Sequence, residues 1–336
     1  MTTIVIDGSH GEGGGQIIRT SVALSALLGA RTIVENIRPR REPPGLQRTH
    51  LEAIRGIASL AGVLLEGDAL GSVRLVLNPP PQPPLGEQWR PSSHATSLIV
   101  QTVLGPSLAV ASTTSRILTK SAPTPERISE IFLQTLQGHG WPLDFQLDDT
   151  GAIVGASSND LRHVRPFDLV ERGALHRLRI YLSSHRVESS ALDDLEAALR
   201  QVAAAIRPEL PVEVVRRVRD YESDGVACTT VLTHDSGTLG DDGAAPADQL
   251  DDFRESRCRA LQTLLESDAP VDESASDQLV LPAALCAVTT GATSRFKVVL
   301  VSEHLRTVLW LVERFLPITV HVDESTRLVT VGARGA

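Results

Sequence analysis

The sequence predicts an α+β fold: three β-α-β-α-β-β units around a pseudo-threefold axis, with a small α+β domain inserted into the third unit. Short β-branched runs alternate with helically spaced apolar residues, and the same order of segments occurs three times. Five prolines between Pro79 and Pro84 mark the end of the first unit. Residues 175–272 have their own pattern of strands and helices. We therefore expect residues 1–174 and 273–336 to form the three-repeat domain and residues 175–272 the inserted domain.

The first two units show the repeated order directly. In the first unit we expect, in chain order, a strand at 2–7, a helix at 13–29, a strand at 32–36, a helix at 46–61, and strands at 63–66 and 73–77. In the second we expect a strand at 87–90, a helix at 94–104, an extended segment at 108–118, a helix at 125–136, and a hairpin of 143–147 with 152–155.

The third unit is interrupted by the insertion. Its own segments are a strand at 164–169, a helix at 276–289, a strand at 295–301, a helix at 304–315, and strands at 318–322 and 327–331. In the insertion we expect a strand at 175–182, a helix at 191–206, strands at 212–218 and 226–232, and a helix at 247–265. We interpret Asp241-Asp242-Gly243 within it as an exposed turn.

Composition is typical of a globular protein, with 42% hydrophobic and 22% charged residues among 336. No apolar run reaches the roughly 18 residues of a membrane span, and the first residues do not start a signal peptide. Three widely separated cysteines indicate a reducing compartment, without a disulfide framework or a zinc site. These features predict a cytoplasmic protein that has no membrane partner.

The net charge of −9 is unevenly distributed. Residues 241–277 contain eleven acidic residues and three arginines, so the rest of the chain is close to neutral. Against this background stands a basic cluster made of Arg31, Arg38, Arg40, Arg41 and Arg48. A local basic patch fits an enzyme that binds one phosphate end better than a protein that coats a duplex. The alternative is a solvated arginine face.

A glycine loop joins the first strand to the first helix. Four glycines, Gly11, Gly13, Gly14 and Gly15, surround the single carboxylate of Glu12. Glycine lets backbone N–H groups approach an anion, and a helix N-terminus adds partial positive charge. A lone acid there suits a cation that bridges phosphates. The alternative is a tight turn with a solvent-facing acid. The spacing matches neither a Walker A loop nor a Rossmann fingerprint.

His304 lies at the start of a predicted amphipathic helix, and Ser302 is its expected N-cap. The positive end of a helix dipole favours the neutral imidazole, which is the nucleophilic form. The alternative is a capping or surface histidine. Other nucleophiles have less support: there is no Gly-x-Ser-x-Gly motif, neither Lys120 nor Lys297 is followed by x-Asp-Gly, and Cys286 lies in an apolar run.

Polar residues recur near the start of the first helix of each unit. If the units pack around a common axis, these residues converge on one cleft, together with His304 from the third unit. They are Glu12, Gln16, Arg19, His94, Gln101, Asp277 and Gln278.

Several stretches together resemble the RNA 3′-terminal phosphate cyclases. They are the glycine loop DGSHGEGGGQIIRTSVALS, the segment IRPRREPPGLQRTHLEAI, the run at 98–104, Ser276–Pro282, and the helix HLRTVLWLVERFLP. The resemblance spans both ends of the chain, whereas the insertion matches only loosely. It implies the same fold that the repeated segments predict.

The resemblance also implies an activity: an ATP-dependent, AMP-forming ligase that converts an RNA 3′-phosphate to a 2′,3′-cyclic phosphate. His304 would attack the α-phosphate of ATP and carry AMP, which passes to the RNA 3′-phosphate before the 2′-OH closes the ring. Glu12 would bind Mg²⁺ or Mn²⁺. Gln101, Asp277 and Gln278, with Gly13 and Gly14, would bind the nucleotide. Gln16, Arg19, Arg38 and Arg41 would hold phosphates and the RNA end, and His50 is a weaker candidate.

The chain departs from the family pattern in its second unit. The triple glycine of the usual signature is missing, and the corresponding segment reads Gly138-His139-Gly140-Trp141-Pro142-Leu143-Asp144-Phe145. The loop before Ser121 is also short, and Ser274 stands where tyrosine is common. Two alternatives to the cyclase remain. One is a catalytically silent cyclase-like factor in RNA processing or assembly, which the presence of His304 disfavours. The other is an enolpyruvyl transferase, which shares the repeat unit but ranks last because the chain has few lysines and no matching basic loop. RNA 3′-phosphate ends and ATP are the expected partners, and a homodimer is left open.

Overall fold

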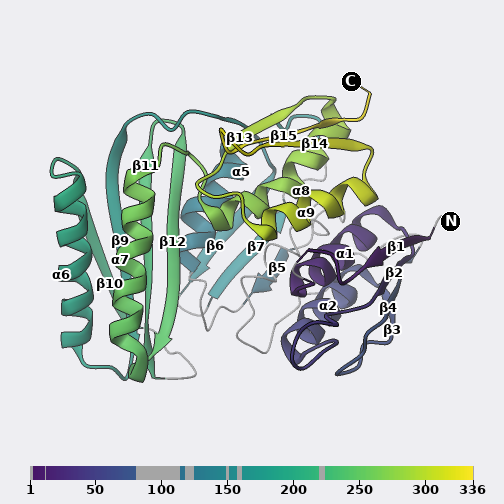
Figure 1. Ribbon diagram of the computed structural model, residues 1–336, viewed down its shortest axis with the longest axis horizontal. Helices are drawn as coiled ribbons and strands as arrows, with labels where there is room; N and C mark the ends of the chain where they lie inside the picture. Colours follow the sequence, from purple (N-terminus) through teal and green to yellow (C-terminus); the bar gives the residue numbers. More distant parts are fainter. Residues whose placement is uncertain are drawn as a thin grey trace.

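The computed structural model describes residues 3–11, 13–80, 114–117, 125–148, 151–156, 161–218 and 224–335. Within these ranges the chain forms four β-sheets with helices packed against them (Figure 1). It is therefore a mixed α/β protein, as the alternating segments of the sequence predict. The predicted strand 87–90 and helix 94–104 lie outside the described residues.

The first sheet has the strand order β1-β2-β4-β3. Its elements in chain order are β1 (Ile4–Asp7), α1 (Gly15–Leu28), β2 (Thr32–Glu35), α2 (Arg48–Ala61), β3 (Leu64–Glu66) and β4 (Leu75–Asn78). Strands β1 and β2 are parallel, and the other pairs are antiparallel. Each helix ends at a glycine in the left-handed region, Gly29 and Gly62, where a side chain would be strained. The predicted elements are confirmed to within two residues.

The sheet near the C-terminus repeats this topology. Its order, β8-β13-β15-β14, pairs β8 with β13 in parallel and the remaining strands antiparallel. Its elements are β8 (Asp168–Leu169), α8 (Glu273–Thr290), β13 (Ser294–Lys297), α9 (Glu303–Phe315), β14 (Ile318–Asp323) and β15 (Leu328–Ala333). Position by position, the strand order and directions match those of the first sheet.

The middle sheet has the order β5-β7-β6, with both pairs antiparallel. Its elements are β5 (Thr114–Ile117), α4 (Pro125–Arg127), η1 (Ile128–Leu133), α5 (Gln134–Gly138), β6 (Leu143–Asp148) and β7 (Gly151–Ala156). The predicted helix 125–136 is present but contains a π-helical stretch, η1, which local sequence does not signal. The arrangement of the three units around one axis remains a prediction.

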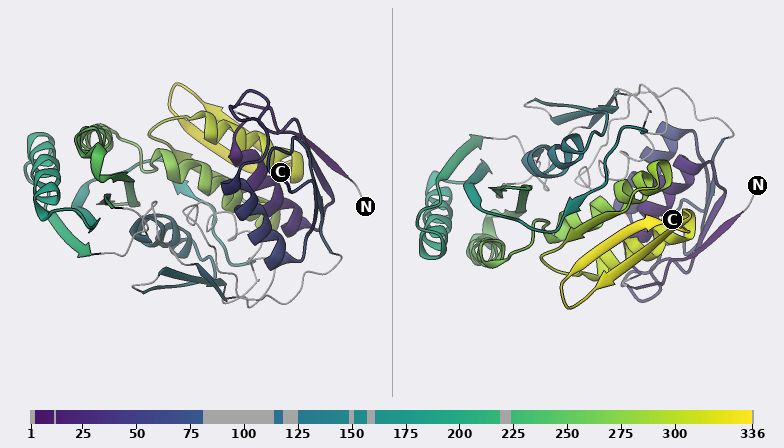
Figure 2. Two further views of the ribbon diagram at one scale, coloured as in Figure 1. Left: turned by 90° about the horizontal axis from the view of Figure 1, so that it is seen from below. Right: turned by 90° about the horizontal axis from the view of Figure 1, so that it is seen from above.

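The fourth sheet contains the longest strands and has the order β10-β9-β11-β12. Its elements are β9 (Leu175–His185), α6 (Ser189–Ile206), β10 (Val212–Val218), β11 (Gly225–His234), β12 (Gly237–Pro246), the short 3-10 helix η2 (Ala247–Gln249) and α7 (Leu250–Glu266). Both α6 and α7 cover one face of this sheet (Figure 2). Predicting an exposed turn at Asp241-Asp242-Gly243 was wrong, because β12 pairs with β11 along its whole length.

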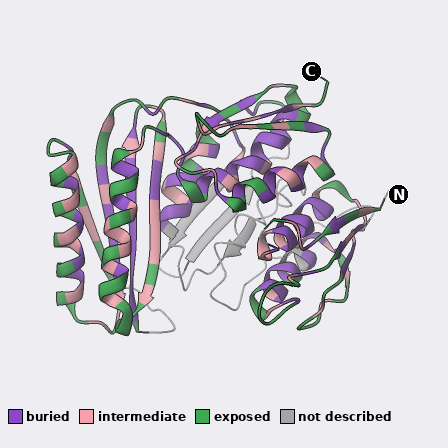
Figure 3. Cartoon of the chain, viewed as in Figure 1, coloured by how far each residue is buried: buried purple, intermediate pink, exposed green. Residues whose placement is uncertain are grey.

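The described residues form two hydrophobic cores. The larger includes buried residues of the first, middle and last sheets with their helices, and the smaller lies between α6, α7 and the fourth sheet. Figure 3 shows the buried faces of the helices turned toward these sheets. Tyr181 and Val231 of the fourth sheet belong to the larger core, so the inserted segment packs against the repeats. The boundaries of the inserted domain stay a prediction. Among the described helices, none is long and apolar enough to cross a membrane.

Candidate active site

Three helix N-termini from distant parts of the chain meet at one cleft. Helix α9 packs against both α1 and α8 (Figure 1), and residues near the starts of all three helices line the same cleft. The cleft has a volume of about 210 Å³. It is lined by Gln16, Arg19, Arg127, Asp242, Glu273, Ser274, Asp277, Gln278, Ser302 and His304. Five of these, namely Gln16, Arg19, Asp277, Gln278 and His304, are residues that the sequence selected.

Helix α1 contributes Gln16 and Arg19 from its first turns. Arg19 Nη2 donates a hydrogen bond to Gln16 Oε1 over 2.8 Å, so the two side chains form one polar unit. The preceding loop is closely packed: a β-carbon at Gly15 would lie 2.5 Å from His50 Nε2 and 2.8 Å from Arg19 Nη1. A side chain at this position would therefore require His50 and Arg19 to move. Gly14 is the N-cap of α1, and Gly13 is buried beside it.

Arg19 and Asp277 face each other under poor solvation. Burial lowers the pKa of Arg19 to about 10, although the nearby Asp277 acts in the opposite direction. Burial raises the pKa of Asp277 to about 7, against the charges of Arg19 and Arg127. For both residues, the loss of hydration disfavours the charged form, and the attraction between the two charges only partly compensates for that loss. The Arg19 guanidinium is therefore a poorly solvated cation at the cleft, a type of group that binds phosphate oxygens well.

Helix α8 brings Asp277 and Gln278 to the cleft from its second turn. The helix begins at Glu273, three residues before the predicted start, because Asp272 caps it. Asp272 Oδ1 accepts a hydrogen bond from the Ala275 backbone N–H over 2.8 Å. Asp272 is also buried, so the start of this helix is fixed by interactions within the protein.

Helix α9 presents His304 at its second residue. Ser302 is the predicted N-cap, and its hydroxyl accepts a hydrogen bond from the Leu305 backbone N–H over 3.2 Å. Leu305, Val308, Leu309, Leu311 and Val312 are buried, and this apolar face leaves His304 exposed at the cleft. A histidine held on a fixed helix start beside a polar cleft can act as a nucleophile toward a bound ligand.

Arg127 is a cleft residue that the sequence did not indicate. Its guanidinium is buried, forms an ion pair with Asp272 and approaches Asp242 Oδ1 to 3.4 Å through Nε. Its Nη1 donates to the Gly240 carbonyl over 3.0 Å, and Gly240 N–H donates to Asp272 Oδ2 over 3.0 Å. Burial alone would lower the pKa of Arg127, but Asp272 and Asp242 raise it above its ordinary value. This network joins α4, β12 and α8 at one wall of the cleft.

Three further candidates, Arg38, Arg41 and His50, lie outside the cleft. Arg38 and Arg41 are not among the residues that line the cleft. Arg38 has a left-handed backbone, and its Nη1 donates to the carbonyls of Pro43 and Gly45 over 3.2 and 3.1 Å. His50 is buried behind Gly15, where burial, Arg38 and Arg19 lower its pKa to about 4. Glu12 and Gln101 lie outside the described residues.

A metal site is not formed by the described residues alone. Among them, no group of three or more histidine, cysteine or acidic side chains is placed to hold a metal ion. The cleft does contain Asp242, Glu273 and Asp277 against the two arginines Arg19 and Arg127. Three carboxylates at one cleft are compatible with a divalent cation, and the predicted ligand Glu12 lies outside the described residues.

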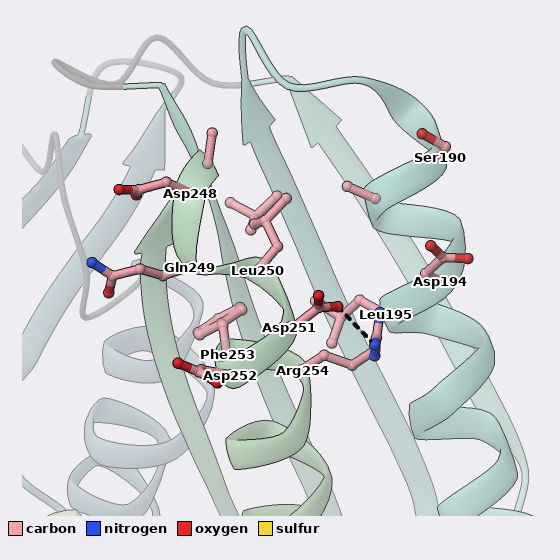
Figure 4. Close-up of a pocket in the computed structure, with 13 residues that line it drawn as sticks. Ser190, Asp194, Leu195, Asp248, Gln249, Leu250, Asp251, Asp252, Phe253 and Arg254 are labelled. Atoms are coloured by element: carbon pink, nitrogen blue, oxygen red, sulfur yellow. Dashed lines mark ion pairs between the residues drawn. The ribbon is translucent and has the colours of Figure 1, made fainter.

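A larger cavity of about 500 Å³ lies between α6 and the start of α7 (Figure 4). It contains none of the residues that the sequence selected. Asp194 projects from α6 and Asp248, Asp251 and Asp252 from the opposite side, and Arg254 is paired with Asp251 over 2.8 Å. Such acidic walls disfavour phosphate groups, so the smaller cleft is the better candidate for nucleotide chemistry.

Comparison with known proteins shows the family of this chain. A family model described as RNA 3′-terminal phosphate cyclase matches residues 10–322. The chain is 31% identical to an RNA 3′-terminal phosphate cyclase of Nostoc punctiforme, over 98% of both chains. It is 32% identical to one of Salmonella agona, over 98% of this chain and 96% of the relative, and 30% identical to one of Methanopyrus kandleri, over 96% of both. The chain therefore belongs to the RNA 3′-terminal phosphate cyclase family.

Proposed function

We propose that this protein uses ATP to convert an RNA 3′-phosphate into a 2′,3′-cyclic phosphate, with His304 as the nucleophile that carries AMP. One observation supports this above the others. Residues chosen from three separate stretches of sequence, Gln16 with Arg19, Asp277 with Gln278, and His304, line the same cleft. An imidazole beside a guanidinium and two amides is suited to attack a bound phosphate.

In the proposed first step a ring nitrogen of His304 attacks the α-phosphorus of ATP. A phosphorus–nitrogen bond forms, the bond from the α-phosphorus to the bridging oxygen breaks, and pyrophosphate leaves. Arg19, with its guanidinium already oriented by Gln16, would bind phosphate oxygens as negative charge develops on them. Asp277 and Gln278 would hold the nucleotide on the α8 side of the cleft.

In the following steps AMP moves from His304 to an oxygen of the RNA 3′-phosphate, and the imidazole is released as the phosphorus–nitrogen bond breaks. The neighbouring 2′-OH then attacks the RNA phosphorus, AMP leaves, and the hydroxyl proton is lost. Adenylation turns a poor leaving group into a good one. The vicinal hydroxyl is already close, so proximity lowers much of the remaining barrier.

The metal and the outer arginines complete the proposal. Glu12 would bind Mg²⁺ or Mn²⁺, which neutralises phosphate charge, and Gln101 would contact the nucleotide. Arg38 and Arg41 would guide the RNA end toward the cleft rather than bind phosphates within it, because neither lines it. We further propose that the three similar units surround a pseudo-threefold axis, which the equal strand orders of the first and last sheets support, and that the protein acts in the cytoplasm, alone or as a homodimer.

The activity is tested with a short RNA that carries a 3′-phosphate, incubated with ATP and Mg²⁺. We expect the phosphate to become resistant to phosphatase while AMP is released. The matched control has a 2′-deoxy terminal nucleotide, which lacks the attacking hydroxyl. It should accumulate an adenylated end without cyclising.

The same assay separates the alternatives. Tight RNA binding without ATP consumption or any change at the RNA end would favour the catalytically silent cyclase-like factor. Cyclisation of the 2′-deoxy control, or cyclisation that continues without ATP, would contradict the proposed order of steps.

A further inference from the structure

The glycine loop touches helix α9 at two successive residues. The His10 imidazole stacks on the Trp310 indole, with ring centroids 3.8 Å apart and planes inclined by 11°. Gly11 lies against Thr307: a β-carbon at Gly11, whose φ is +55°, would be 2.6 Å from Thr307 Oγ1. The Thr307 hydroxyl is itself fixed, because it donates to the Glu303 carbonyl over 2.7 Å. The loop is thus fitted to one face of α9.

The two contacted residues, Thr307 and Trp310, lie on the same helix as His304. The residues 304, 307 and 310 are spaced by three, so each lies about one turn from the next along the helix. With a rise of about 1.5 Å per residue, Trp310 is roughly 9 Å along the axis from His304. From His10 to Gly11 the loop therefore runs toward the end of α9 that carries the proposed nucleophile. Glu12 is the next residue in the sequence.

His10 also anchors the turn of the loop. Its carbonyl accepts a hydrogen bond from Gly13 N–H over 2.9 Å, and its own N–H donates to the Asp7 carbonyl over 3.2 Å. The Trp310 ring has a second neighbour, because the Arg314 guanidinium carbon lies 5.4 Å from its centre. The Trp310 indole therefore contacts both His10 and Arg314, and the backbone of the stacked His10 is hydrogen-bonded to Asp7 and Gly13 of the loop.

We propose that the His10–Trp310 stack is a positioning contact. It holds the glycine loop at a fixed position relative to His304, so that the loop and the His304 imidazole bind the same triphosphate. The inference rests on the proposed function, since it assigns the loop to ATP. It predicts that the aromatic character of both residues matters for ATP binding, although neither lines the cleft.

The test is the dissociation constant of the magnesium complex of α,β-methylene ATP, which binds like ATP but cannot transfer AMP, measured by calorimetry on the full chain. An aromatic pair contributes enough that Trp310→Leu and His10→Ala should each weaken binding about two- to tenfold. Trp310→Phe and His10→Phe, which restore a stacked ring, should bind close to wild type. The double variant His10→Ala/Trp310→Leu should bind the analogue no more weakly than whichever single variant binds it less tightly, because both substitutions remove the same contact.

Phe315→Leu is the matched control, since it removes an aromatic ring from the same helix away from the loop. It should bind like wild type. Equal dissociation constants for Trp310→Leu and wild type, or a failure of Trp310→Phe to rescue, would overturn the inference, as would no detectable binding by wild type. AMP transfer from ATP is measured in parallel. Loss of transfer with the binding pattern intact would refute the proposed function alone.

Discussion

Asp277 is a carboxyl group whose surroundings disfavour its charge. It is partly buried at the cleft and feels the charges of Arg19 and Arg127, yet its pKa is raised to about 7 because desolvation outweighs both guanidinium groups. In the unfolded chain an aspartate titrates near pH 4, roughly. Between these two values the folded protein binds more protons at this site than the unfolded chain does. This carboxyl group therefore makes the fold less stable as the pH rises through that window.

The Asp277→Asn variant isolates this effect. We expect its free energy of unfolding, relative to wild type, to increase between pH 5 and pH 8 by up to a few kcal/mol, since the amide does not ionise. Chemical denaturation at the two pH values measures it, with the exposed Asp248→Asn as control. A difference between Asp277→Asn and wild type that stays constant with pH, or that falls as pH rises, would show that Asp277 titrates normally.

At the scale of elements, one buried ion-pair network fixes the start of α8. Arg127 comes from α4, Asp242 from β12, and Asp272 is the N-cap of the helix that carries Asp277 and Gln278. The side chains of these three charged residues are at most 9% exposed. Removing one partner from such a network leaves a buried charge uncompensated, which is more damaging than losing the pair as a whole.

Arg127→Met should therefore lower the free energy of unfolding by about 3–5 kcal/mol. The control is Arg295→Met, which breaks the exposed 2.8 Å pair with Asp168 between β13 and β8, and should cost about 1 kcal/mol or less. Both are measured by chemical denaturation at pH 7. Equal losses in the two variants would mean that the Arg127 network does not hold the cleft wall as we describe.

The elements that the sequence predicts correctly are stabilised by local interactions, whereas the elements that it misses are stabilised by contacts with distant segments. The helix starting near His304 was predictable because a serine cap and a strong apolar period are local signals. Strand β12 was not, since GTLGDDGAAP lacks β-branched residues apart from Thr238 and is held by its partner strand β11. The π-helical turn of η1 likewise has no local signature.

At the scale of the whole molecule, the cleft depends on contacts between segments far apart in the chain. Repeated segment order and polar helix starts were enough to predict that Gln16, Arg19, Asp277, Gln278 and His304 would converge. The sequence did not predict that Arg127 and Asp242 line the cleft, because they meet only when β12 packs against the middle unit. An arginine and an aspartate more than one hundred residues apart carry no sign of their pairing in the sequence.

The central claim is that one imidazole at this cleft carries AMP. It is tested most directly by incubating the protein with ATP labelled at the α-phosphate and Mg²⁺, then measuring acid-labile label on the denatured chain. We predict label on wild type and on His321→Ala, whose histidine is exposed on β14, and none on His304→Ala. Label that persists on His304→Ala would contradict the account.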